Sequence, residues 1–444
     1  MKIIVKVLAI SIKNLKERVF KTIDEISEEI IKIGEEIRGT PELGFKEVRT
    51  SSIVKREFEK LGLDYEDGLA LTGVVARLKE TREKPAIAVL GELDAVPCPE
   101  HPLADKKTGA AHACGHNVQV AIMLAVGRSL LESGVINELS GNVVLMAVPA
   151  EEYVEIEYRL KLREEGKIEF LGGKQELVRL GVFDNVDLAM MVHAWPRMPQ
   201  RKVWINFTSN GFISKYARFI GKAAHAAAAP HEGVNALNAA ALAILAIHAQ
   251  RETFRDEDSV RVHGIITKGG DAVNVVPSDV RMEMYVRGKT YEAIEDASLK
   301  VDRALKAGAL AVGGRVEIRN IPGYLPLIQD KNLSTVFKNN ATELLGEKGV
   351  VEGGHQAWST DMGDVSHIIP SIHPMIGGFD GDAHAKNFDI KDPEMAYIIS
   401  TKIVASTIID LLANNASTAK QIVASFKPKM TKGKYLEYLR KMFK

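Results

Sequence analysis

Short apolar runs alternate with segments of helical periodicity in the first half of the chain, and this alternation limits the folds open to it. The runs cover residues 86–91, 142–148 and 186–192. Helical patterns cover residues 15–38, 48–62, 118–134 and 174–181. Strands that are apolar throughout are typical of a parallel sheet that is buried on both faces. We therefore expect an α/β domain with a mostly parallel sheet and helices on both faces.

The pattern changes near residue 208. Half-buried strands are expected at residues 213–221, 260–267 and 279–288, and helices at residues 235–250 and 291–310. In the third of these strands, apolar and polar residues alternate, which places Arg287 on the polar face. Two helices among antiparallel strands, over about 110 residues, are the composition of a small α+β domain.

Parallel-sheet character returns after about residue 320, so the simplest architecture is an α/β domain interrupted by an inserted α+β domain. A chain of 444 residues also exceeds the roughly 250–300 residues at which a single core stops growing. We expect the α/β domain at residues 1–207 and 319–417, the inserted domain at 208–318, and a tail at 418–444. The tail holds eight Lys and Arg residues against one Glu, which predicts a solvated, partly helical, basic segment.

Bulk charge and cysteine content exclude several kinds of partner. Lys plus Arg and Asp plus Glu both number 58, so no net field attracts nucleic acid or an anionic membrane. No run approaches the roughly 18 apolar residues of a membrane span. The two cysteines, Cys98 and Cys114, exclude a disulfide framework and fit a reducing compartment. We expect a cytoplasmic protein with no nucleic-acid or membrane partner.

Residues that bind metals or carry protons follow each of the three apolar runs. In order along the chain they are Glu92, Asp94, Glu151, Glu152 and His193. The stretch "GAAHACGHN" at residues 109–117 adds three more candidates just before a predicted helix: His112, Cys114 and His116. Ligands of open α/β sheets bind outside the carboxyl ends of the strands. The sequence therefore predicts that these side chains converge on one rim of the sheet.

Three interpretations of this cluster compete: a metal site, a nucleophilic cysteine with a histidine base, and a buried cluster without chemistry. Two adjacent carboxylates after a buried strand are costly unless a cation or a proton compensates them. A cysteine nucleophile would use Cys114 with His112 or His116 and leave the glutamate pair unused. Thiolate, imidazole and carboxylate are all normal zinc ligands, so the metal site is favoured.

Ordered motifs across roughly residues 20–415 resemble the metal-dependent aminoacylase and carboxypeptidase family, peptidase family M20, in its amidohydrolase subfamily. The motifs are "PELGFKEVRTS", "GELDAVP", "GAAHACGHN", "PAEE", "VHAWP", "GKAAHAAAAPHEGVNAL", "GGDAVNVVPSDVRMEMYVR" and "STDMGDVSHIIPSIHP". "CGHN" and the last motif are similar to the branch of aminobenzoyl-glutamate hydrolases and dipeptidase-like aminoacylases.

The resemblance implies a catalytic domain with two divalent metal ions, most commonly zinc, with manganese, cobalt or nickel as alternatives. It also implies that the inserted domain is a lid that forms a homodimer or a higher oligomer. The implied ligands are Cys114, His116, Glu152, His193 and His384. His384 lies in "DGDAHAKNF", and its rivals His367 and His373 lie in or beside an apolar run and are expected to be structural.

The resemblance further implies how the remaining site residues act. Glu151 would be the general base for attack by a metal-bound water, and His225 of the lid would stabilise the oxyanion, across a dimer if one forms. Asn274 and Arg287 would hold the substrate carboxylate. Glu92 stands where many relatives have a histidine, so Asp94 is expected to support the ligands rather than bind metal. The charged segment 153–173 is longer than expected for the family and would cap or narrow the site.

These inferences lead to a hydrolase that cleaves an amide bond next to a free carboxylate. The expected substrates are N-acyl amino acids, dipeptides or aminobenzoyl-glutamate-like amides. The alternatives are a relative that binds peptides or amides without cleaving them, and a hydrolase that uses Cys114 as its nucleophile.

Overall fold

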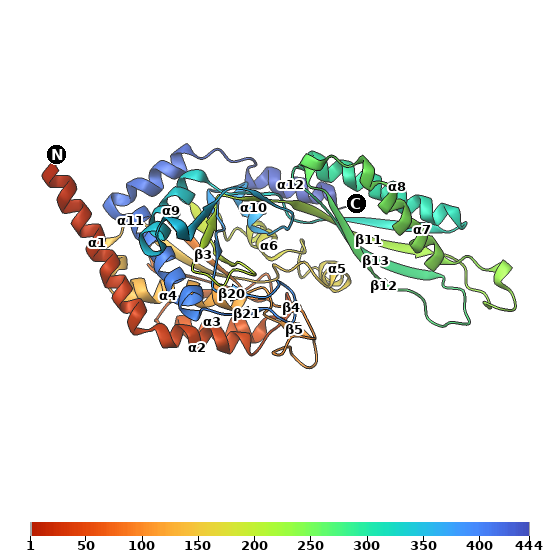
Figure 1. Cartoon of the computed structure of the whole chain (residues 1–444), viewed down its shortest axis with the longest axis horizontal. Helices are drawn as coiled ribbons and strands as arrows, with labels where there is room; N and C mark the ends of the chain where they lie inside the picture. The colour runs from red at the N-terminus through yellow and green to blue at the C-terminus, as the bar shows by residue number, and fades with distance from the viewer. Residues whose placement is uncertain (1, 444) are drawn as a thin grey trace.

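The computed structural model describes residues 2–443, and the side chains of residues 12–443. A six-stranded sheet in the order β1-β2-β6-β3-β7-β18 forms the centre of the larger domain (Figure 1). Its strands are β1 (Tyr65–Leu69), β2 (Gly73–Arg77), β6 (Asn142–Val148), β3 (Ala86–Glu92), β7 (Leu188–Met190) and β18 (Ser371–Ile372).

The four strands from β6 to β18 pair in parallel, whereas β1 and β2 form an antiparallel edge. Strands β3 and β6 cover the first two predicted runs, and β7 is shorter than the third. The antiparallel edge was not predicted, because its strands are short and half-polar. The predicted α/β fold class is confirmed.

The side chains of β3 alternate between two cores. Ile87 and Val89 pack into the core on one face of the sheet, and Ala88 and Leu90 pack into the core on the other. The first core is built with α1 (Lys2–Glu25), α2 (Ser27–Arg38), α3 (Val48–Lys60), α4 (His116–Glu132), α9 (Lys331–Leu345) and α11 (Ser400–Ser425). The second is built with α6 (Gly173–Leu180), α10 (Met362–Ser366) and α12 (Lys432–Met442). The single helix predicted at residues 15–38 is two helices that meet at Ile26.

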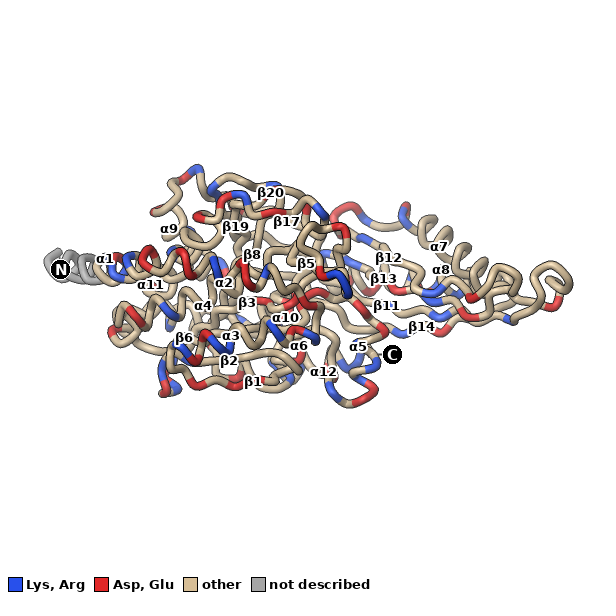
Figure 2. The backbone as a smooth tube through the Cα atoms, turned by 90° about the horizontal axis from the view of Figure 1, so that it is seen from below, with Lys and Arg blue, Asp and Glu red and all other residues tan. Residues whose placement is uncertain are grey.

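The inserted domain is a four-stranded antiparallel sheet in the order β12-β13-β11-β14 with two helices on one face. Its elements are β11 (Gly211–Ile220), α7 (Ala236–Ala249), β12 (Arg261–Lys268), β13 (Asp279–Gly288), α8 (Tyr291–Ala311) and β14 (Arg315–Pro322). It projects from the α/β domain in Figure 1, and its helix α7 has no charged residue, as the tan tube in Figure 2 shows. Strand β14 was not predicted, and it runs past the expected boundary at residue 318.

The two segments that connect the inserted domain to the α/β domain lie side by side. Strands β11 and β14 are neighbours in its sheet, and the backbone N–H of Phe212 donates to the carbonyl of Tyr324 at 2.8 Å. A double-stranded connection restricts twisting between the domains more than a single crossing would.

Smaller sheets and helices complete the chain. They are a sheet of β16 (Val350–Glu352), β9 (Val203–Ile205), β19 (Met375–Ile376) and β8 (His193–Ala194), a sheet of β15 (Leu327–Ile328), β10 (Thr208–Ser209) and β17 (His355–Gln356), the pairs β4 (Val96–Pro97) with β5 (Ala110–Ala111) and β20 (Phe379–Asp380) with β21 (Asp389–Ile390), and helix α5 (Ile156–Glu164).

One helical stretch is long and apolar enough to cross a membrane, which the sequence analysis did not anticipate. It joins a π-helical segment (Glu394–Ile399) to α11, and 83% of its most apolar window is buried inside the protein. Its backbone also leaves the helical conformation at residues 413–416. This stretch therefore has the burial of a core helix.

The basic tail was expected to be solvated, but part of it packs on the protein core. Helix α12 inserts Tyr435 and Leu439 fully into the second core, and Arg440 donates to Glu169 at 2.6 Å. The two apolar residues lie one helical turn apart, a pattern that the surrounding lysines conceal in the sequence.

We expect Leu439→Ala to lower the free energy of unfolding by about 2–5 kcal/mol, because it removes a fully buried side chain. The control is Leu180→Ala at the end of α6, where the leucine is 44% exposed and the expected change is within about 0.5 kcal/mol. Chemical denaturation measures both. Equal effects of the two substitutions would show that α12 does not pack on the core in solution.

Candidate active site

The predicted site residues gather at the carboxyl ends of the parallel strands. Glu92 ends β3, Glu151 and Glu152 follow β6, and His193 follows β7. His116 is the first residue of α4, which begins after Gly115 with φ of 84°. A Cβ at Gly115 would lie 2.5 Å from the Cβ of Ala194, so the tight turn requires glycine.

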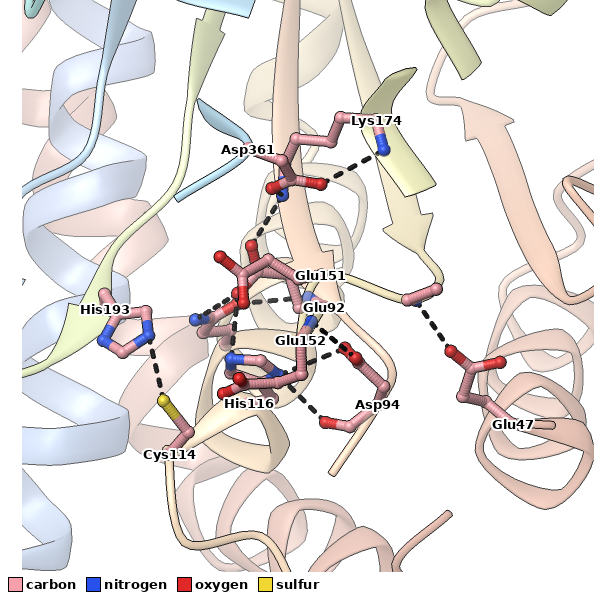
Figure 3. Close-up of polar contacts among 12 residues, drawn as sticks. Glu47, Glu92, Asp94, Cys114, His116, Glu151, Glu152, Lys174, His193 and Asp361 are labelled. Carbon is pink, nitrogen blue, oxygen red and sulfur yellow. Dashed lines mark hydrogen bonds and ion pairs between the residues drawn. The ribbon is translucent and has the colours of Figure 1, made fainter. Parts of the chain in front are cut away.

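Cys114 points toward His193 at one side of the cluster (Figure 3). Its Sγ lies 3.5 Å from His193 Nε2 and 3.3 Å from His384 Nε2, and His384 Nε2 lies 3.0 Å from Glu152 Oε1. His384 is far from Cys114 in the sequence. Its backbone N–H donates to the carbonyl of Ala113 at 2.8 Å, and this bond holds the loop beside the site. The structure thus brings both ends of the predicted ligand set together.

Among residues 12–443, potential ligand atoms within 4.8 Å of one another form three groups. They are Cys114 with His116 and His193, Cys114 with Glu152 and His384, and Glu92 with His116 and Glu151. The first two groups contain all five predicted metal ligands and share the sulfur of Cys114. Soft sulfur, imidazole and carboxylate make a donor set that suits zinc and neighbouring transition metals.

Electrostatics in the cluster favour a cation. Burial and Glu152 act to raise the pKa of Cys114, but the imidazoles of His193 and His384 lower it to about 6. Glu152 and then Cys114 raise the pKa of His384 to about 12, against the effect of burial. The negative groups that hold a proton on His384 are the same groups that would hold a metal ion there.

Asp94 supports two of its neighbours. Its carboxylate accepts the backbone N–H of Glu152 at 2.8 Å, and its own carbonyl lies 2.9 Å from His116 Nδ1. The Nε2 of His116 lies 3.1 Å from Glu92. Among the described residues, this nitrogen and Asp94 Oδ1 are both buried with no hydrogen-bond partner. Buried polar atoms of this kind fit the neighbourhood of an ion.

Glu151 differs from Glu152 in its surroundings. Its pKa is raised well above the ordinary value, by burial and then by the nearby Glu92 and Glu152 carboxylates. Glu152 faces His384, which lowers its pKa to about 2 against the effect of burial. Two adjacent carboxyl groups with opposite pKa shifts suit different tasks, a proton acceptor and an anionic ligand.

Lys174 is a site residue that the sequence analysis missed. Its side chain is fully buried, and its Nζ donates to Glu92 Oε1 at 2.6 Å and to Asp361. The ammonium lowers the pKa of Glu92 against the effect of burial. The "GGK" that starts α6 gave no signal, because a lysine in the first turn of a helix is usually exposed.

A cavity of about 370 Å³ extends from the cluster to the inserted domain. Arg287 lies in its wall, where its guanidinium donates to Ser359 Oγ at 2.8 Å and to His263 at 3.1 Å. The rings of Phe212 and Tyr285 lie 5.1 Å and 5.2 Å from the guanidinium carbon. The predicted polar-face position of Arg287 thus points into the cavity, and the aromatic rings restrict its guanidinium.

The long segment after the glutamate pair forms part of the cavity wall. Tyr153 and Val154 line the cavity, and Tyr153 packs edge-on against Phe212 and Tyr324. The phenol of Tyr285 also donates to the carbonyl of Tyr153. The start of this segment therefore forms part of the cavity wall, next to residues of the inserted domain.

His225 and Asn274 are not brought to the cavity. Both are exposed on the inserted domain, where the N–H of Ala226 donates to the carbonyl of Asn274 at 3.0 Å. Within a single chain they form their own surface, apart from the cluster around Cys114.

The remaining histidines differ in their partners. His367 is structural, as expected, since its ring lies 2.6 Å from the Tyr291 hydroxyl and 2.8 Å from the Pro326 carbonyl. His112 is buried beside the cluster. His373, which was also expected to be structural, lines the cavity instead.

Comparisons with known proteins identify the family of the chain. The family model described as Peptidase family M20/M25/M40 matches residues 88–410. The Xaa-Arg dipeptidase of Mus musculus is 30% identical over 98% of this chain and 94% of its own length. The IAA-amino acid hydrolase ILR1-like 2 of Arabidopsis thaliana is 27% identical over 88% of this chain and 87% of its own length.

A solved structure shares the fold. The YXEP protein of Bacillus subtilis, described as a dinuclear metal binding peptidase from the M20 family, superimposes with a TM-score of 0.64 at 22% identity. The match covers 88% of this chain and 99% of that one. The resemblance found in the sequence motifs is confirmed: the chain belongs to peptidase family M20/M25/M40 and is a hydrolase.

Proposed function

We propose that this protein is a metal-dependent hydrolase that cleaves an amide bond next to a free carboxylate. The substrates would be N-acyl amino acids, dipeptides or aminobenzoyl-glutamate-like amides. The observation that carries this proposal is one cavity with two chemically different ends, the ligand groups around Cys114 and the guanidinium of Arg287. The names of the mouse and Arabidopsis relatives, a dipeptidase and an amino acid hydrolase, support amide substrates of these classes.

Cys114, His116, Glu152, His193 and His384 would hold two divalent ions, zinc or else manganese, cobalt or nickel. When bound, such ions lower the pKa of water and polarise a carbonyl group. Glu151 would take the proton from the attacking water and deliver it to the leaving amine, a task that suits its raised pKa. Asp94 would keep His116 and Glu152 in place.

Arg287 would bind the carboxylate next to the scissile amide. A guanidinium presents two parallel N–H donors that match a carboxylate. The cation is desolvated in the cavity wall, so a substrate carboxylate would be a strong partner for it.

We further propose that the lid, expected at residues 208–318, forms a homodimer or a higher oligomer. Strand β12 is an edge of the lid sheet, and its Ile265 is 63% exposed. Leu245 of the uncharged helix α7 is exposed as well. A second copy on this face is the arrangement by which His225 and Asn274 would reach an active site and bind the oxyanion and the carboxylate. Two buried, unpaired cysteines support a reducing compartment such as the cytoplasm.

We expect a chelator to abolish hydrolysis of N-acyl amino acids and dipeptides, and added zinc, manganese or cobalt to restore it. Chelator already saturated with metal is the control and should leave the activity unchanged. A cysteine-nucleophile hydrolase, which the lowered pKa of Cys114 would also serve, would keep its activity in the chelator and lose it on alkylation of the metal-free protein. A binding protein would hydrolyse nothing in either state.

We expect Glu151→Gln to lower kcat at least about 100-fold, because the amide cannot accept the proton of water. Its metal content, measured by mass spectrometry, should match the unsubstituted protein. Glu152→Gln is the matched comparison and should lose metal, since it removes an anionic ligand. Turnover close to that of the unsubstituted protein in Glu151→Gln would contradict the mechanism.

A further inference from the structure

His373 presents an unsatisfied imidazole to the cavity. Its side chain is fully buried, and it belongs to the cavity wall. Within the described part of the chain, neither of its ring nitrogens has a hydrogen-bond partner. An unpaired buried polar group normally destabilises a protein, so its retention calls for an explanation.

The position of His373 is between the two ends of the cavity. Its ring centroid lies 5.3 Å from that of His193, a proposed metal ligand. On the other side it lies 6.3 Å from the ring of Trp358, whose neighbour Ser359 accepts from Arg287. A substrate that reached from the cluster to Arg287 would pass close to this imidazole.

The backbone of His373 is anchored. It lies between the short strands β18 and β19, and its backbone N–H donates to Gln329 Oε1 at 2.9 Å. An imidazole carried on an anchored and buried backbone would lose little energy to reorganisation during the reaction.

His373 also lacks the surroundings of a metal ligand. Among the described residues, it joins none of the three groups whose ligand atoms lie within 4.8 Å of one another. Its fellow candidate His367 has partners at both ring nitrogens, so it has no donor left to offer.

We propose that His373 donates a hydrogen bond to the carbonyl oxygen of the scissile amide, and that this bond strengthens as the oxygen becomes an oxyanion. His373 would act beside His225, which lies exposed on its own chain and would reach the oxyanion across a dimer. The imidazole keeps its proton throughout. The proton of water still passes through Glu151 to the amine nitrogen as the carbon–nitrogen bond breaks. The inference rests on the proposed amide hydrolysis.

The test is His373→Phe, which keeps a ring of similar shape and removes both nitrogens. We expect kcat to fall about 100-fold to 1,000-fold, because one oxyanion donor is lost, with KM changed only a few-fold. Metal content should stay the same, and the melting temperature should not fall, since an unsatisfied polar group is removed. His373→Gln, whose side-chain amide can donate, should recover part of kcat.

Two substitutions provide matched comparisons. His367→Phe removes two hydrogen bonds of another buried histidine, so it should lower the melting temperature and leave kcat of the folded protein unchanged. Arg287→Met should chiefly raise KM, because Arg287 would bind the substrate carboxylate. The opposite effects of the two His→Phe substitutions on stability and on kcat separate a role in turnover from a structural one.

Three results would overturn the inference. Loss of metal from His373→Phe would make the residue a ligand, a rise in KM alone would make it a carboxylate contact, and unchanged kinetics would remove it from the reaction. In each case the unsubstituted protein would still cleave amides and the proposed function would stand. If the unsubstituted, metal-loaded protein cleaved no amide, the proposed function would fail and this inference with it.

Discussion

The ion pairs of Lys174 support the arrangement at the end of the central sheet. Glu92, Asp94, Glu151, Glu152 and Asp361 are all buried there. One buried ammonium, within 2.6 Å of Glu92 and bonded to Asp361, offsets part of this charge. Burial of a lone carboxylate costs several kcal/mol, so the strand ends can hold this many acids only with compensating cations. Lys174 supplies one of these cations, and the histidines around Cys114 supply protons or sites for others.

The division of labour between the two adjacent glutamates follows from the same electrostatics. Glu151 faces other carboxylates, and Glu152 faces His384. Neighbours in the sequence thus have opposite proton affinities because they point to different sides of the cluster. The chemistry of the "PAEE" motif depends on segments that lie hundreds of residues away, such as the loop that carries His384.

The sequence was informative wherever local patterns determine position. Strands β3 and β6 follow from apolar runs, and parallel strands necessarily bring the residues at their carboxyl ends to one rim, so the convergence of Glu92, Glu151 and His193 could be predicted. His384 came from motif order alone, and its backbone bond to Ala113 is a long-range contact that no local pattern reveals. Lys174 and His373 owe their environments to segments distant in the sequence. Nothing local to either residue therefore indicated a place in the active site. The tail was expected to be partly helical, but the packing of helix α12 on the core was not predicted because lysines surround its two buried residues.

The paired connection of the inserted domain has a consequence for how such chains can be engineered. Because β11 and β14 are hydrogen-bonded neighbours where they meet the α/β domain, the inserted domain begins and ends at adjacent positions. Removal of such a module leaves a gap that a short turn can close, since closing a short loop between adjacent ends costs little entropy. The inserted domain thus joins the chain through two adjacent ends, and neither end belongs to the six-stranded sheet whose strand ends carry the ligand groups.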